Sequence, residues 1–284
     1  MNTDGTSLTY VYAVARQTER LEALLVGLGG IDDAPVTLLT DASDTTTPLA
    51  FVISHVPQDE FSESALKAHF EDLEWLEGVA RAHHEVVQAV AAEATVLPLR
   101  MATVYQDDPR ARQALGEQRR TLVQRMASLD AHTEYGVKIY LPPPAPPTGA
   151  ESSAEAAASD VEAPYASPGK AYLQRRRVQH HARERIYEQA QRAAAALEVI
   201  AARYTSQRVR HAPQTGALTG PQENVLNDAY LVRDADADGF RAAIAQSAQD
   251  FPEIRIEVTG PWAPYSFAMP PAEPSVPADE ERAS

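Results

Sequence analysis

The succession of apolar and polar runs constrains this chain most, because it predicts the same order of elements twice. In the first half, strand-like runs lie at Leu8–Ala15, Val36–Thr40, Pro48–Val56 and Val96–Tyr105. Helical periodicity follows the first and the third of them. Strand, helix, strand, strand, helix, strand is the split βαβ order of a ferredoxin-like fold. The first half is therefore predicted to be one ferredoxin-like domain, with a further helix at Pro109–Asp130.

The second half repeats this order without visible residue identity to the first. Its first and last strands are predicted at Glu134–Leu141 and Glu253–Gly260, with two further strand candidates between them. A long helix at Gly169–Tyr204 and a shorter one at Ala237–Asp250 complete the pattern. The predicted fold class is α+β, with two ferredoxin-like (βαββαβ) domains and additional helices.

The domain limits follow from length and from two biased segments. The chain has 284 residues, more than the roughly 100–150 of a typical single domain. We predict an N-terminal α+β domain at residues 1–132 and a C-terminal one at 133–269. Residues 142–168 are rich in Pro, Ala, Ser and Glu and cannot bury enough apolar surface to fold, so we expect a mobile insertion there. The acidic tail at 270–284 is expected to be disordered for the same reason.

Charge and cysteine content exclude several classes of function. A net charge of −15 opposes binding to nucleic acid, which needs clustered Lys and Arg. The absence of cysteine excludes disulfides, a thiol nucleophile and thiolate metal sites. The N-terminus does not resemble a signal peptide, and no apolar run approaches the roughly 18–20 residues that span a bilayer. We therefore expect a cytoplasmic protein that binds neither nucleic acid nor a lipid membrane.

Two motifs suggest metal ligands but are better explained by structure. DADADG at Asp234–Gly239 matches the first half of an EF-hand loop, but Ala245 stands where the bidentate Glu is needed. We interpret it as an acidic helix N-terminus. The histidine pairs at 83–84 and 180–181 are adjacent in predicted helices, where neighbours point about 100° apart. Neither pair is therefore expected to offer two ligands on one face, and we predict no metal, no cofactor and no catalytic residues. Chelators are expected to leave the stability unchanged.

The helix over Gln174–Arg192 is basic within an acidic chain. One interpretation is a solvated helix, in which Glu184 and Glu188 form ion pairs with the arginines around them at helical spacing. The alternative is docking of an acidic partner. On that alternative the candidate protein-binding residues are Arg175, Arg176 and Arg177.

The stretch VTGPWAPYSF, at 258–267, places several large aromatic residues in a kinked, proline-locked segment. Proline fixes φ and removes a backbone donor, so the chain leaves the last strand in one preset direction. Trp262, Tyr265 and Phe267 are candidate protein-binding residues in this segment. For Trp262 we favour core packing, so that Trp262→Ala would cost roughly 3–5 kcal/mol. For Tyr265 we favour a partner surface, since its hydroxyl needs a polar or wet environment.

Five segments in series resemble the gas vesicle accessory proteins of the GvpF and GvpL family. They are VLPLRMATVY, EYGVKIY, GKAYLQRRR, NDAYLVRD and VTGPWAPYSF, close to the family forms VLPLRFGTVF, EWGVKVY, GxxYLxRR, NxAYLV and TGPWPPYSF. The resemblance covers nearly the whole chain from Tyr10 to Phe267. Met101 and Ala102 replace the usual Phe-Gly, Tyr135 replaces Trp, and Ala263 replaces the first Pro of a Pro-Pro pair.

The resemblance implies a non-enzymatic role in gas vesicle formation. Members of the family are expected to bind the small, very hydrophobic shell protein, and other accessory proteins, during assembly and to be minor vesicle constituents. The expected localisation is cytoplasmic, in association with gas vesicles. A second function stays open from the fold alone, namely a ferredoxin-like regulatory protein that binds a small ligand.

Overall fold

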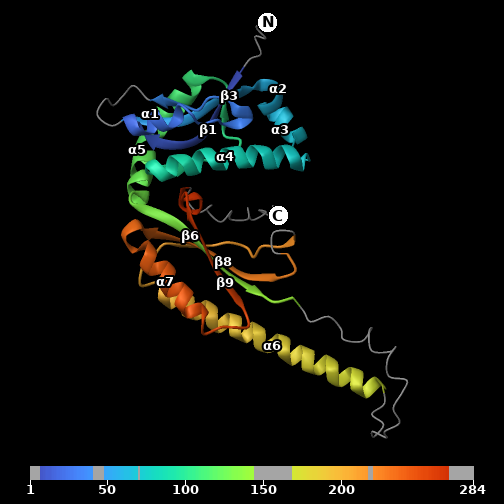
Figure 1. Ribbon diagram of the computed structural model, residues 1–284. Helices are drawn as coiled ribbons and strands as arrows, with labels where there is room; N and C mark the ends of the chain where they lie inside the picture. The colour runs from blue at the N-terminus through green and yellow to red at the C-terminus, as the bar shows by residue number, and fades with distance from the viewer. Residues whose placement is uncertain (1–6, 41–47, 70, 144–167, 217–219, 269–284) are drawn as a thin grey trace, which may run out of the picture. The chain divides into compact units, whose positions relative to one another are not determined.

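The computed structural model describes residues 7–40, 48–69, 71–143, 168–216 and 220–268 (Figure 1). They divide into two compact units, and the second of these is Tyr135–Gly260. The first unit contains the residues before Tyr135 together with the C-terminal segment from Pro261. The C-terminal domain predicted from the sequence, at 133–269, includes that segment. Most of the predicted mobile insertion, and the predicted tail, lie outside the described residues.

The first unit is built on an antiparallel sheet of long and short strands in the order β2-β3-β1-β4. The short strand β5 also pairs with β1. Its strands are β1 (Ser7–Arg16), β2 (Thr37–Thr40), β3 (Leu49–Pro57), β4 (Val96–Pro98) and β5 (Val104–Tyr105). The third strand lies between the first and the second, as a split βαβ connection requires. The predicted ferredoxin-like arrangement is confirmed for this unit.

Three helices of the first unit begin directly after a capping side chain. Thr18, Asp72 and Asp107 each accept a hydrogen bond from a backbone N–H of the first turn, which satisfies a donor that the helix leaves unpaired. The helix α4 buries valine side chains in the core of this unit. The elements are α1 (Glu19–Leu25), the 3-10 helix η1 (Ile31–Asp33), α2 (Gln58–Phe61), α3 (Glu63–His69), α4 (Leu73–Glu93), α5 (Asp108–Leu129) and α8 (Tyr265–Ala268).

A tight loop between β4 and β5 adjoins an irregularity in β1. The pairing of β1 with β3 shifts register between Val11 and Ala13. The loop closes with Ala102, whose backbone N–H donates to Tyr10 Oη at 3.0 Å. Ala102 has φ of +62°, a left-handed conformation that costs a residue with a Cβ roughly 1–2 kcal/mol. The residue stands where the family form has glycine.

Ala102→Gly is expected to raise the free energy of unfolding by about 0.5–1 kcal/mol, because relief of this strain exceeds the extra chain entropy of glycine. Urea unfolding measures the change. Ala127→Gly, at an exposed position of α5, is the control and should lower stability by about 1 kcal/mol. Destabilisation by both substitutions would contradict the assignment of strain to Ala102.

The second unit repeats the strand order in its own sheet, β7-β8-β6-β9, in which β7 and β8 pair antiparallel. This confirms the predicted second ferredoxin-like arrangement. DADADG forms η3 and the start of α7, as predicted. The elements are β6 (His132–Leu141), α6 (Pro168–Ala201), β7 (Arg208–Arg210), β8 (Glu223–Arg233), the 3-10 helix η3 (Asp234–Asp236), α7 (Ala237–Ala248) and β9 (Arg255–Trp262).

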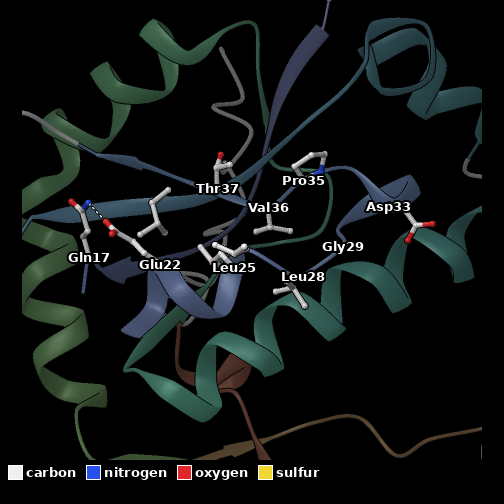
Figure 2. Close-up of a pocket in the computed structure, with 12 residues that line it drawn as sticks. Gln17, Glu22, Leu25, Leu28, Gly29, Asp33, Pro35, Val36 and Thr37 are labelled. Atoms are coloured by element: carbon white, nitrogen blue, oxygen red, sulfur yellow. Dashed lines mark hydrogen bonds between the residues drawn. The ribbon is translucent and has the colours of Figure 1, made fainter. Parts of the chain in front are cut away.

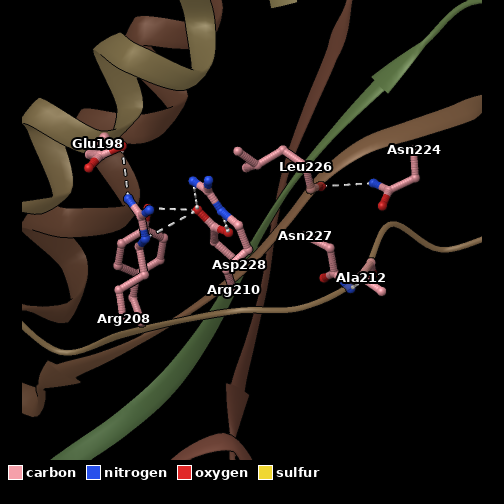
Figure 3. A network of polar contacts seen from close by, with 9 residues as sticks. Glu198, Arg208, Arg210, Ala212, Asn224, Leu226, Asn227 and Asp228 are labelled. Atoms are coloured by element: carbon pink, nitrogen blue, oxygen red, sulfur yellow. Dashed lines mark hydrogen bonds and ion pairs between the residues drawn. The ribbon is translucent and has the colours of Figure 1, made fainter. Parts of the chain in front are cut away.

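Two of the segments that resemble the family forms make packing and ion-pair contacts within this second unit. In EYGVKIY, a Cβ on Gly136 would lie 2.5 Å from Thr259 Oγ1, so any larger residue there would require the Thr259 side chain to move. In NDAYLVRD, the carboxylate of Asp228 is 1% exposed and lies 3.1 Å from Arg210 and 3.6 Å from Arg208 (Figure 3). Both arginines belong to the short edge strand β7, so the buried charge is paired across the β7–β8 junction.

Candidate interaction surface

The C-terminal segment Pro261–Ala268 is held on α4 by one side chain. Gln88 Nε2 donates to the carbonyl of Pro261 at 3.3 Å, and Gln88 Oε1 accepts from the N–H of Ala263 at 2.5 Å. Ala263 itself is buried in the core of the first unit. Pro261 and Pro264 have no N–H to satisfy and fix φ on either side. A single amide thus fixes the backbone that carries Trp262.

The far end of the same segment is held by a buried carboxylate. Glu134 is 8% exposed, and its two oxygens accept from the N–H and the hydroxyl of Ser266 at 2.8 and 2.7 Å. Burial raises the pKa of Glu134, and the bonds from Ser266 oppose that rise. Arg125 Nη1 donates to the carbonyl of Ala268 at 2.9 Å. These contacts give Glu134, the first residue of EYGVKIY, a structural role. The sequence alone does not mark this residue as functional.

Tyr265 points into the first unit. Its ring lies 6.1 Å from that of His84 and 6.4 Å from that of His83, centroid to centroid, and packs against the core. Its hydroxyl is buried and has no hydrogen-bond partner among the described residues. Burial raises the pKa of this hydroxyl. The prediction that Tyr265 faces a partner is wrong for its hydroxyl, since the kinked segment turns that group inward.

Trp262 is the aromatic side chain that this segment presents outward. It is 40% exposed, and its ring lies 5.7 Å from that of His84. The favoured prediction of core packing for Trp262 is therefore wrong, because the backbone held by Gln88 turns the indole away from the core. Phe267 is half-buried. We call Pro261, Trp262, His84 and Gln88 the Trp262 surface.

Beneath this surface, His83 is buried among aromatic rings. It is 4% exposed, and its Nδ1 lies 2.9 Å from Tyr10 Oη. The Tyr12 ring centroid is 5.6 Å from that of His83. Burial lowers the pKa of His83 to about 4, and a contact with the backbone of Leu99 opposes this shift. His83 is therefore uncharged at neutral pH and supports the surface from within.

The predicted arginine cluster lies in the N-terminal part of α6, which extends past the strands of its own sheet in Figure 1. Arg176 and Arg177 are exposed; the backbone of Arg175 lies in α6, but its side chain is outside the described residues. Glu184 contacts His180 and His181, and among the described side chains it forms no ion pair with the predicted arginines. Two arginines are thus available to solvent on a projecting helix.

A shallow groove of about 580 Å³ lies beside the edge strand β2. Figure 2 shows its lining, in which Gln17 Nε2 donates to Glu22 Oε1. Apolar side chains of Leu25, Leu28 and Val36 form much of it, and the charged lining residues are acidic. Such a groove suits an apolar or cationic group, not an anion. None of the residues predicted from the sequence lines it.

No helix in the part of the chain that the structure describes combines the length and apolarity needed to cross a bilayer. The family model "Gas vesicle synthesis protein GvpL/GvpF" matches residues 8–269. Gas vesicle protein L of Streptomyces sp. (strain CB03234) is 37% identical over 269 residues, 94% of each chain. Gas vesicle protein F of the same strain is 29% identical over 262 residues, 91% of this chain and 98% of that one.

Two solved structures have a similar fold. The crystal structure of GvpF from Anabaena sp. PCC7120 matches with a TM-score of 0.59 at 18% identity, covering 93% of this chain and 97% of that chain. The crystal structure of GvpF from Microcystis aeruginosa matches with a TM-score of 0.57 at 17% identity, covering 92% and 99%. At this identity the likeness concerns the α+β fold.

Proposed function

This chain belongs to the GvpL/GvpF family of gas vesicle synthesis proteins, and from that premise we propose that it binds the hydrophobic shell protein while the vesicle is being assembled. Its family membership supports an accessory role linked to gas vesicles. The binding of the shell protein, the site of that binding and the association with vesicles in the cytoplasm are parts of the proposal. The proposed role in assembly is non-enzymatic.

The observation that carries the proposal is the exposure of Trp262 on a fixed backbone. An indole is a large, rigid group, and tryptophan is enriched among residues that dominate binding energy. Because Gln88 and the flanking prolines already restrict the segment, little conformational entropy remains to be lost on binding. The Trp262 surface is therefore suited to an apolar partner.

The charge of the chain fits the same role. A subunit that buries its apolar face only in a polymer needs cover before assembly, since large exposed apolar patches lead to aggregation. A carrier with a net charge of −15 keeps such a complex in solution by repulsion between copies. Arg175, Arg176 and Arg177 form a separate part of the proposal, as a contact for acidic accessory proteins.

Trp262→Ala is expected to weaken binding of the shell protein by at least about tenfold, which is the loss typical of an interface hot spot. Binding is measured by titrating labelled shell protein with the purified full chain. Leu73→Ala is the matched control, because Leu73 is 78% exposed on α4 of the same unit and lies outside the Trp262 surface. Its affinity should equal that of the wild type.

Equal binding by Trp262→Ala and the wild type would place the contact elsewhere. A pull-down from cells that express the whole vesicle gene cluster tests the broader role. Absence of shell and accessory vesicle proteins from that pull-down would contradict an assembly function altogether.

A further inference from the structure

Three potential metal ligands converge on one turn of α6. His180 Nδ1 lies 3.3 Å from one carboxylate oxygen of Glu184, and His181 Nδ1 lies 3.0 Å from the other. The ligand atoms of all three residues fall within 4.8 Å of one another. The expectation that adjacent histidines diverge is therefore wrong here, because Glu184, one turn along, lies within reach of both rings. In the pair at 83–84, His83 is buried and His84 is half-exposed.

From this geometry we propose that His180, His181 and Glu184 bind a divalent transition-metal ion of the Zn²⁺ class. Zn²⁺ bound tetrahedrally at about 2.0–2.1 Å from its ligands separates them by roughly 3.4 Å. The two His–Glu distances lie near that value, and all three ligand atoms fall within 4.8 Å of one another. All three residues belong to α6, and their side-chain rotamers bring the ligand atoms together.

The chemistry of the donors selects the class of ion. Two imidazoles and one carboxylate suit Zn²⁺, Ni²⁺ or Cu²⁺, whereas Mg²⁺ and Ca²⁺ prefer oxygen ligands alone. An exposed carboxylate such as that of Glu184 supplies the ionised oxygen that a metal ligand requires. On binding, the ion replaces the Nδ1–H of each ring that faces Glu184, and the neutral imidazole then carries its proton on Nε2.

The position of the site determines its character. The three side chains are 72%, 70% and 51% exposed, so three protein ligands leave at least one coordination position to water. A site so exposed holds no core residues together, and removal of the ion should leave folding intact. The proposal does not depend on the proposed function.

Isothermal titration of the tag-free full chain with Zn²⁺ tests the site. The wild type is expected to bind one Zn²⁺, and an excess of Mg²⁺ should not compete. Glu184→Gln should weaken binding at least tenfold, and the double substitution His180→Ala, His181→Ala should abolish it. Glu188→Gln makes the same charge change one turn further along the exposed face of α6 and should leave the affinity unchanged.

Co²⁺ in place of Zn²⁺ gives a second readout, because a site with nitrogen and oxygen ligands produces visible absorption bands that Glu184→Gln should shift or remove. Circular dichroism of each variant checks that α6 still forms. No Zn²⁺ binding by the wild type, or equal affinities for Glu184→Gln and Glu188→Gln, would show that the cluster is only a set of hydrogen-bonded side chains and overturn the proposal.

Discussion

Tyr265→Ala is expected to lower the free energy of unfolding by about 3 kcal/mol, whereas Trp262→Ala should lower it by less than about 1 kcal/mol. Removing an aromatic ring from a packed site loses its transfer energy and leaves a cavity. The Tyr265 ring packs against the core and the rings of His83 and His84, while the Trp262 ring is 40% exposed. This is the reverse of the order predicted from the sequence.

Chemical unfolding of the two variants measures the difference. Tyr265→Phe is the matched control, since it keeps the ring and removes a buried hydroxyl that has no hydrogen-bond partner among the described residues. Its stability should equal or exceed that of the wild type, because an unsatisfied buried polar group costs about 1–3 kcal/mol. A larger loss for Trp262→Ala than for Tyr265→Ala would mean that the indole is the buried ring.

A second large effect is expected on acidification, through His83. Burial lowers its pKa to about 4 in the folded protein, from an ordinary value of 6.5. Between these values the unfolded chain binds the proton and the folded chain does not. The contribution of His83 is therefore fully present above pH 6.5 and is lost as the pH falls towards 4. The loss amounts to about 3 kcal/mol.

The measurement compares unfolding free energies of the wild type and His83→Gln from pH 7 to pH 4. The variant cannot titrate at this position, so its stability should fall less steeply over that range. The tyrosines around His83, which are Tyr10, Tyr12 and Tyr265, have pKa values raised by burial and stay uncharged. Glu134, whose pKa burial raises, is present in both proteins, so the difference between the two profiles isolates His83. Parallel pH profiles would contradict the assignment.

Much of the fold could be predicted from the sequence because strand and helix periodicities are local. The two split βαβ patterns, the additional helix α5 and the acidic start of α7 all follow from residues close together in the chain.

The candidate site could not be predicted in the same way, because its contacts join distant residues. Gln88 and Ala263 are 175 residues apart, and nothing in a glutamine on a helix marks it as a backbone anchor. Trp262 and Tyr265 lie in a segment with no strand or helix period, so no pattern says which ring turns inward. The convergence of His180 and His181 depends on rotamers around Glu184, which helix geometry alone does not specify.

The first unit contains the segment from Pro261 as well as the residues before Tyr135, and this has a consequence for biosynthesis. During translation, chains generally fold domain by domain from the N-terminus. Here the ribosome must make the whole second unit before it supplies Pro261–Ala268. Until then the face of α4 around Gln88 lacks the segment that packs on it, and the Trp262 surface forms only after Pro261–Ala268 has been made.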